Sequence, residues 1–174
     1  FNNLANPQMF IQDFGLTTND HYQHGFMFQY GGSSLPYMRF ATGASGAQIE
    51  TRSSSSAIST GQWYHIVVTA ELGTGASGAV IYRNGSSDTH TSSSHTNFIK
   101  STRSLQAISR YFVAGGLISA QSINGKLDDL RIYNRVLTSA EISELYNLYN
   151  SSSSGLSTGH GAYFDPASNT SSLS

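Results

Sequence analysis

The stretch that most constrains the fold runs from residue 125 to residue 150, where a strand-like pattern is followed closely by a helix-like one. Within residues 127–133 one set of alternate positions is Asp128, Leu130 and Ile132, which is the two-residue period of a β-strand. Asn134 and the residue after it break the alternation. The pattern predicts a strand that ends in a tight connection.

A capping box then predicts the start of a helix. The Thr138 hydroxyl is placed to cap the first turn, and Glu141 is placed to reach back to the cap residue. Leu137 and Ile142 occupy the two positions of a hydrophobic staple. The apolar residues that follow have the spacing of one helical face: Ile142, Leu145, Tyr146 and Tyr149. One short amphipathic helix is therefore expected near the C-terminus.

Composition and turn residues predict β-structure for the rest of the chain. Only 11% of the residues are charged, and glycine, serine and aromatic residues are abundant, as in sandwiches of short strands joined by polar loops. The strongest strand pattern is residues 63–70, where alternation places Tyr64, Ile66 and Val68 on one face. Asn84-Gly85 predicts a two-residue hairpin turn. The other expected strands are residues 9–11, 25–30, 37–41, 48–52, 79–83, 98–99 and 111–113.

Four stretches resemble motifs of the laminin-G-like (concanavalin A-like) jelly-roll domains. Residues 125–146, GKLDDLRIYNRVLTSAEISELY, resemble the closing motif of that family. Upstream, and in the family's order, lie GQWYHIVVT at 61–69, IYRNG at 81–85 and YFVAGG at 111–116. The resemblance implies an all-β fold, a two-sheet antiparallel jelly-roll sandwich with one short helix near the C-terminus.

The two ends of the chain depart from the family pattern. No good match to the opening strands precedes Gly25, whereas residues 161–165, GAYFD, resemble the first of them. An open sheet edge is unfavourable, so the tail is expected to fold back, to donate a strand to a neighbouring copy, or to open a following domain. A merely flexible tail is the simpler alternative. We expect the sandwich in residues 1–150 and a linker with a further strand in residues 151–174. Because the chain begins with Phe1, it is expected to be processed or cut from a longer protein.

Charge and cysteine content exclude several classes of partner. The formal net charge of −1 provides no basic patch, so no nucleic acid partner is expected. No apolar run approaches the roughly 20 residues that a membrane span requires. Cysteine is absent, so the fold is expected to hold without disulfides.

Acidic and histidine residues suggest two metal sites. Asp128 and Asp129 precede the closing strand, and the family resemblance implies Asp165 as a further ligand of a calcium ion. The alternative is that Asp129 pairs with Arg131 and that Asp128 accepts hydrogen bonds from loop N–H groups. His21 and His24 lie near Asp20, but this set is too small for zinc, and a solvent-facing loop is the preferred interpretation.

Aromatic residues at the ends of strands are the candidate sugar-binding residues, because aromatic rings stack on the apolar faces of sugars. They are Tyr22, Tyr30, Tyr37 and Tyr111, which can equally cap the core. Trp63 is expected in the core, because it begins the most apolar strand and the family buries it.

No catalytic residues are predicted. Glycosidases on this fold require two carboxylates facing each other across a cleft, and no strand carries alternate carboxylates here. We expect a non-catalytic carbohydrate-binding or adhesion module of a cell-surface, secreted or virion protein, with a glycan or cell-surface ligand as partner. The alternative is a structural subunit of a filament, fibre or particle surface, in which copies exchange terminal strands. A glycoside hydrolase ranks below both.

Overall fold

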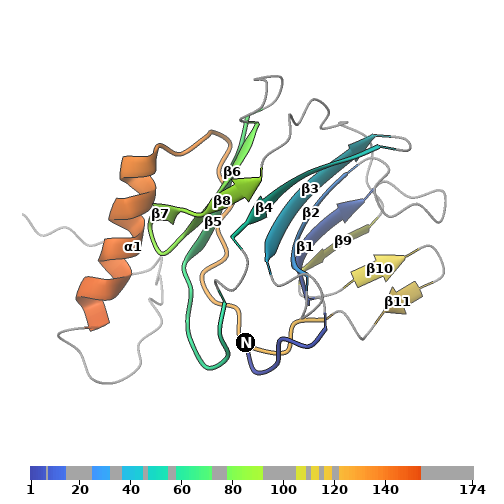
Figure 1. Cartoon of the computed structure of the whole chain (residues 1–174), viewed down its shortest axis with the longest axis horizontal. Helices are drawn as coiled ribbons and strands as arrows, with labels where there is room; N and C mark the ends of the chain where they lie inside the picture. The colour runs from blue at the N-terminus through green and yellow to red at the C-terminus, as the bar shows by residue number, and fades with distance from the viewer. Residues whose placement is uncertain are drawn as a thin grey trace, which may run out of the picture.

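The computed structural model describes residues 1–6, 8–14, 25–31, 37–44, 47–54, 58–71, 78–91, 105–108, 111–113, 116–118 and 122–153. These residues form two antiparallel sheets, with one helix near the C-terminal end (Figure 1). The predicted two-sheet sandwich is therefore confirmed. Residues 154–174 lie outside the described residues, so the expected division into a domain and a tail stays a prediction.

Every neighbouring pair of strands is antiparallel. The large sheet contains, in spatial order, β8 (Thr89–Thr91), β4 (Ala47–Ser53), β3 (Met38–Ala44), β2 (Gly25–Tyr30), β1 (Gln8–Phe14) and β9 (Leu105–Ile108). The small sheet contains β5 (Ile66–Ala70), β6 (Ala79–Arg83) and β7 (Ser86–Ser87). A two-stranded ribbon of β10 (Tyr111–Val113) and β11 (Gly116–Ile118) lies beside β9, and α1 (Ser139–Ser153) lies beside β7 (Figure 1).

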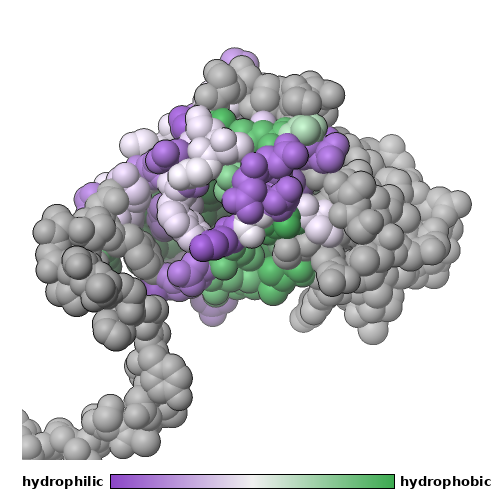
Figure 2. Space-filling view, turned by 90° about the horizontal axis from the view of Figure 1, so that it is seen from below, coloured by the Kyte–Doolittle hydropathy of each residue, from purple (hydrophilic) through white to green (hydrophobic). Residues whose placement is uncertain are grey.

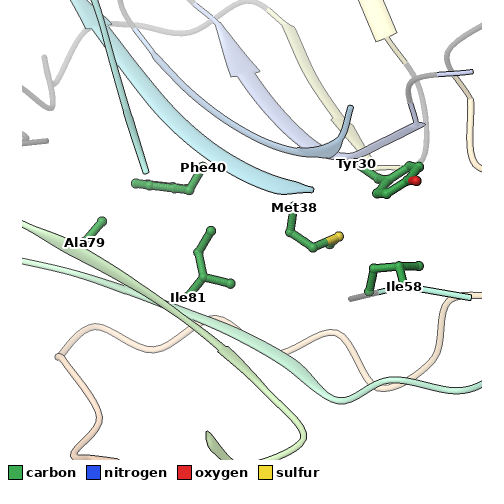
Figure 3. Close-up of a cluster of buried hydrophobic side chains, with 6 residues drawn as sticks. All are labelled: Tyr30, Met38, Phe40, Ile58, Ala79 and Ile81. Atoms are coloured by element: carbon green, nitrogen blue, oxygen red, sulfur yellow. The ribbon is translucent and has the colours of Figure 1, made fainter. Parts of the chain in front are cut away.

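The core lies between the two sheets. The large sheet contributes Tyr30, Met38 and Phe40, and the small sheet faces them with Ala79 and Ile81 (Figure 3). Ile58, in the connection between β4 and β5, closes one end of the cluster. Alternate residues of each strand point inward, as the two-residue period requires. The alternation predicted for Tyr64, Ile66 and Val68 is confirmed, because all three pack against this cluster.

The Asn84-Gly85 turn joins β6 to β7 as predicted. Both residues have positive φ, 52° for Asn84 and 79° for Gly85, as the type I′ hairpin turn requires. The Asn84 backbone N–H donates to the His65 carbonyl at 2.8 Å, and the Asn84 side-chain oxygen accepts from the His65 N–H at 3.1 Å. These two hydrogen bonds fix the turn to His65, the residue that precedes β5. After β7 the chain crosses to the large sheet at Asp88, whose carboxylate pairs with Arg83 at 3.1 Å.

Gly85→Ala is expected to destabilise the fold more than Gly61→Ala does. Both glycines have positive φ, so an added Cβ strains each by about 1 kcal/mol. At Gly61 the Cβ would meet nothing within 4 Å, whereas at Gly85 it would lie 3.0 Å from Tyr146 of α1. Overpacking should add about 1 kcal/mol or more at Gly85 alone. Urea unfolding of the two variants measures the difference, and equal losses would show that α1 does not pack on the turn.

The helix begins as its capping box predicts. The Thr138 hydroxyl accepts from the Glu141 N–H at 3.2 Å, and the Glu141 carboxylate accepts from the Thr138 N–H at 2.8 Å. Both staple residues, Leu137 and Ile142, are buried. The helix continues to Ser153, three residues into the expected linker, because nothing in the serine run stops it.

Arg135→Ala is expected to raise the pKa of Glu141. The guanidinium of Arg135 donates two hydrogen bonds to this carboxylate, at 2.9 and 2.7 Å, and with the Thr138 cap it lowers the Glu141 pKa to about 2. A lowered folded-state pKa stabilises the fold above the unfolded value of 4.5, and this stabilisation is lost as the pH falls towards 2. An NMR titration of the side-chain carboxyl carbon measures the pKa. An unchanged value in the variant would refute the pair.

The predicted closing strand is wrong in this structure. Residues 125–137, hereafter the closing segment, belong to none of the described strands. Asp129 has a φ of 49°, a left-handed conformation that interrupts an extended run. The apolar side chains of Leu127, Leu130, Ile132, Tyr133 and Val136 are consequently exposed rather than paired across a sheet.

The other strands agree with their sequence patterns to different degrees. Residues 25–30, 79–83 and 111–113 form strands with the predicted bounds. The strand predicted at 63–70 begins only at Ile66, and the sequence patterns predict none of β8, β9 and β11. The strand expected at residues 98–99 lies outside the described residues.

Candidate functional site

Two of the four predicted sugar-binding tyrosines, Tyr30 and Tyr37, are buried. Tyr30 is 2% exposed and packs its ring 5.5 Å from that of Phe1, and burial raises its pKa. Tyr37 is also buried, with the Arg52 guanidinium over its ring at 4.9 Å. These two rings are closed to a sugar and cap the core instead. Tyr22 lies outside the described residues, as does the side chain of Tyr111.

The two described calcium candidates have other partners. The Asp129 carboxylate pairs with the Arg131 guanidinium at 2.9 Å, and the Asp128 carboxylate accepts from the Asp129 N–H at 2.9 Å. Within the described part of the chain, no group of three or more histidine, aspartate or glutamate residues is arranged to hold a metal. The donors therefore do not fit a calcium ion by themselves. Asp165 and the set of Asp20, His21 and His24 lie outside the described residues, so calcium binding stays a prediction.

Trp63, expected in the core, is 65% exposed. Trp63 and Tyr64 both precede β5, and of the two it is Tyr64 that packs on the core. Tyr64 is fixed in its inward position, because it packs on the core and its hydroxyl accepts from the Ser59 N–H at 2.8 Å. The Trp63 indole is therefore exposed to solvent next to Tyr64, whose position is fixed.

Hydrogen bonds bring three segments together near the N-terminus, at the lower end of the molecule in Figure 1. The Phe1 carbonyl accepts from the Gly61 N–H at 2.9 Å, and the Asn2 N–H donates to the Asn124 carbonyl at 2.7 Å. The Asn124 N–H in turn donates to the side-chain oxygen of Gln8, at 2.9 Å. These bonds join the N-terminal residues, the loop before β5 and Asn124, the residue just before the closing segment.

Exposed amide side chains lie on the segments that these hydrogen bonds bring together. The side chains of Asn2, Gln62, Trp63 and Asn124 are exposed, and we call this set the Trp63 end. Figure 2, which views the molecule from below, shows hydrophilic residues beside hydrophobic ones on this side. An amide both donates and accepts hydrogen bonds, so the Trp63 end offers one aromatic face and several paired donors and acceptors. Tryptophan one position before the inward-facing Tyr64 is the sequence signal that could have found it.

His65, two residues after Trp63, contacts both the Asn84-Gly85 turn and α1. Besides its backbone bonds to Asn84, its ring lies 6.0 Å from that of Tyr146 on α1. Burial lowers the pKa of His65, with a smaller raising effect from Asp129 and a lowering effect from Arg131. A lowered folded-state pKa means that the fold favours the neutral imidazole, and this stabilisation is lost as the pH falls below 6.5.

A shallow cavity of about 200 Å³ lies between the closing segment and α1. Its walls are mainly leucine and tyrosine side chains, with the Arg135–Glu141 ion pair among them. The lining residues are Tyr133, Arg135, Leu137, Glu141, Glu144, Leu145 and Leu148.

Comparison with known proteins identifies the family. The profile of the laminin G family described as the concanavalin A-like lectin/glucanases superfamily matches residues 2–143, most of the chain. The protein therefore belongs to this superfamily, as the motif resemblance implied. No curated protein matches the chain significantly.

A comparison with solved structures matches a segment of an S-layer domain-containing protein from Clostridium thermocellum. It is 24% identical with a TM-score of 0.40, and the match covers 84% of this chain and 65% of that one. Within the described residues, no helix is long and apolar enough to cross a membrane.

Proposed function

We propose that the chain is a non-catalytic carbohydrate-binding module of an extracellular protein, and that the Trp63 end receives the sugar. The observation that carries this proposal is the 65% exposed indole of Trp63, on a loop that is hydrogen-bonded to the N-terminal residues, where exposed amide side chains also lie. An aromatic side chain of this size is costly to leave in water unless it contacts something. The superfamily includes lectins by its description, which supports the same reading.

The chemistry of the Trp63 end suits a neutral sugar. Pyranose rings carry C–H groups on one face, which pack on an aromatic ring, and hydroxyls around the edge. The amides of Asn2, Gln62 and Asn124 provide both donors and acceptors for such hydroxyls. Sites of this kind combine an apolar surface with a few placed polar groups.

The state of the acidic residues supports a non-catalytic role. Hydrolysis of a glycosidic bond requires two carboxylates that are free to act on the sugar. Four described carboxylates are instead ion-paired with arginines: Glu50, Asp88, Asp129 and Glu141. None of them belongs to the Trp63 end.

Trp63→Ala is expected to lower the affinity for a bound glycan at least tenfold, about 1.4 kcal/mol, because the stacking surface is lost. A glycan array with the wild-type chain identifies the sugar, and titration calorimetry with that sugar measures the change. Ile108→Ala is the matched control, since it removes another exposed large apolar side chain, on β9. Equal affinity of the Trp63 variant and the wild type would contradict the proposal, as would a chain that binds no glycan.

Two further expectations stay predictions. Repeating the array with calcium and with a chelator tests whether glycan binding depends on a calcium ion, for which Asp128 and Asp129 are the candidate ligands. Assembly through exchanged terminal strands is tested by the oligomeric state, which the crosslinking experiment below also reports.

A further inference from the structure

We propose that residues 161–165 of the C-terminal tail dock within the same chain, in the groove between the closing segment and α1. This inference concerns a different surface from the Trp63 end and does not depend on sugar binding. It rests on the apolar groove, on the sequence of the tail and on the length of the connecting chain.

The groove is apolar and open. Its cavity of about 200 Å³ is lined by Tyr133 on one side and by Leu145 and Leu148 on the other. Leu148 is 60% exposed, and Tyr133 is 42% exposed. Exposed apolar residues that line one hollow mark a surface that contacts another segment. A cavity of about 150 Å³ accepts a benzene-sized group, so this one has room for one aromatic side chain.

The tail contains a segment that fits this groove. Residues 154–174 are mostly serine, glycine, threonine and asparagine, and Ala162-Tyr163-Phe164 is their longest run of apolar and aromatic residues. Gly161 precedes this run, and Pro166 follows soon after it, so turn-forming residues delimit the segment. Phe164 is the side chain we assign to the cavity.

The connecting chain is long enough for docking within one molecule. Leu148 lies five residues before the end of α1, which corresponds to about 8 Å along the helix. The nine steps from Ser153 to Ala162 span up to about 30 Å when extended. The tail can therefore turn back over the last turns of α1. A short connector of this kind gives a millimolar effective concentration, which favours the same chain over a neighbouring copy.

Docking would cover apolar surface that otherwise promotes association between copies. Docking would also connect the exposed side of α1 to the closing segment. The closing segment itself pairs with none of the described strands.

Paired cysteines test the proposal cleanly, because the chain has no cysteine of its own. The variant Leu148→Cys with Phe164→Cys should form an intramolecular disulfide under mild oxidation, seen as a faster-migrating monomer on a non-reducing gel. The control is Leu148→Cys with Leu173→Cys, which uses the same groove residue and a later apolar residue of the tail. For a flexible tail, loop length alone makes the first pair only about twofold faster. We expect a difference of at least tenfold.

A second measurement uses single substitutions in the tail. Phe164→Ser should speed amide hydrogen exchange in residues 145–148 and in the closing segment, whereas Leu173→Ser should not. Equal crosslinking rates in the two cysteine pairs, or equal exchange in the two serine variants, would overturn the proposal. Disulfides formed only between two chains would overturn it too, and would instead support strand exchange between copies. Glycan binding is read separately, so its failure leaves this test unaffected.

Discussion

Glu50→Gln is expected to lower the free energy of unfolding by about 3 kcal/mol, because it removes the negative charge that pairs with a buried guanidinium. Arg39, on β3, is 8% exposed, and its Nε lies 3.5 Å from the Glu50 carboxylate on β4. The same carboxylate also pairs with Arg52. The Glu50 carboxylate thus balances the positive charges of two arginines next to the core. Because Arg39 is buried, water cannot take the place of the lost carboxylate there.

Glu71→Gln is the matched control for this experiment. Glu71 lies just after β5 and is exposed, so its neutralisation should change stability by less than about 1 kcal/mol. Urea unfolding followed by circular dichroism gives both values. Similar small changes in the two variants would show that Arg39 is not buried as the structure places it.

Ile81→Ala is expected to lower the free energy of unfolding by about 2–5 kcal/mol. Ile81 is fully buried on β6 and faces Met38 and Phe40 of the large sheet (Figure 3). Truncation removes buried apolar surface and leaves a cavity between the sheets, because the packed sheets cannot close over it completely.

Two controls bound this prediction. Ile81→Val should cost about 0.5–1.5 kcal/mol, since it removes one methyl group from the same position. Ile132→Ala, the same change at an exposed position in the closing segment, should be nearly neutral. If Ile132→Ala destabilised the chain as much as Ile81→Ala, the closing segment would be buried and the description of its exposed face would be wrong.

The parts of the fold that depend on local chemistry followed from the sequence. The capping box at Thr138 and the turn at Asn84-Gly85 are set by residues within a few positions of each other, and both are confirmed by the hydrogen bonds and backbone angles of the structure. The inward face of β5 followed from alternation for the same reason. Family membership followed from four motifs in a fixed order.

The features that depend on distant contacts did not follow from the sequence. Alternation in residues 127–133 describes a strand, but only a paired neighbour makes one, and the positive φ of Asp129 prevents a continuous extended run. The β9 strand is recognisable only from its pairing with β1. Position at the end of a strand did not tell Tyr30 and Tyr37 apart from exposed aromatic residues, because their burial depends on Phe1 and Arg52, which come from elsewhere in the chain.

The candidate site also combines features set by neighbouring residues with features set by contacts between distant segments. The family pattern and the start of the most apolar strand both suggested that Trp63 is buried, but β5 begins only at Ile66 and Trp63 is 65% exposed. The approach of the segments that carry Asn2, Gln62 and Asn124 was not predictable, since hydrogen bonds between residues more than fifty positions apart bring these segments together.

Fluorescence of the single tryptophan tests the central claim most directly, because all indole emission comes from Trp63. The proposal predicts an emission maximum typical of an indole in water, efficient quenching by acrylamide, and protection from that quenching when the glycan identified on the array is added. A blue-shifted emission that resists acrylamide in the free chain would contradict it, because Trp63 would then be part of the core and not a surface for sugar.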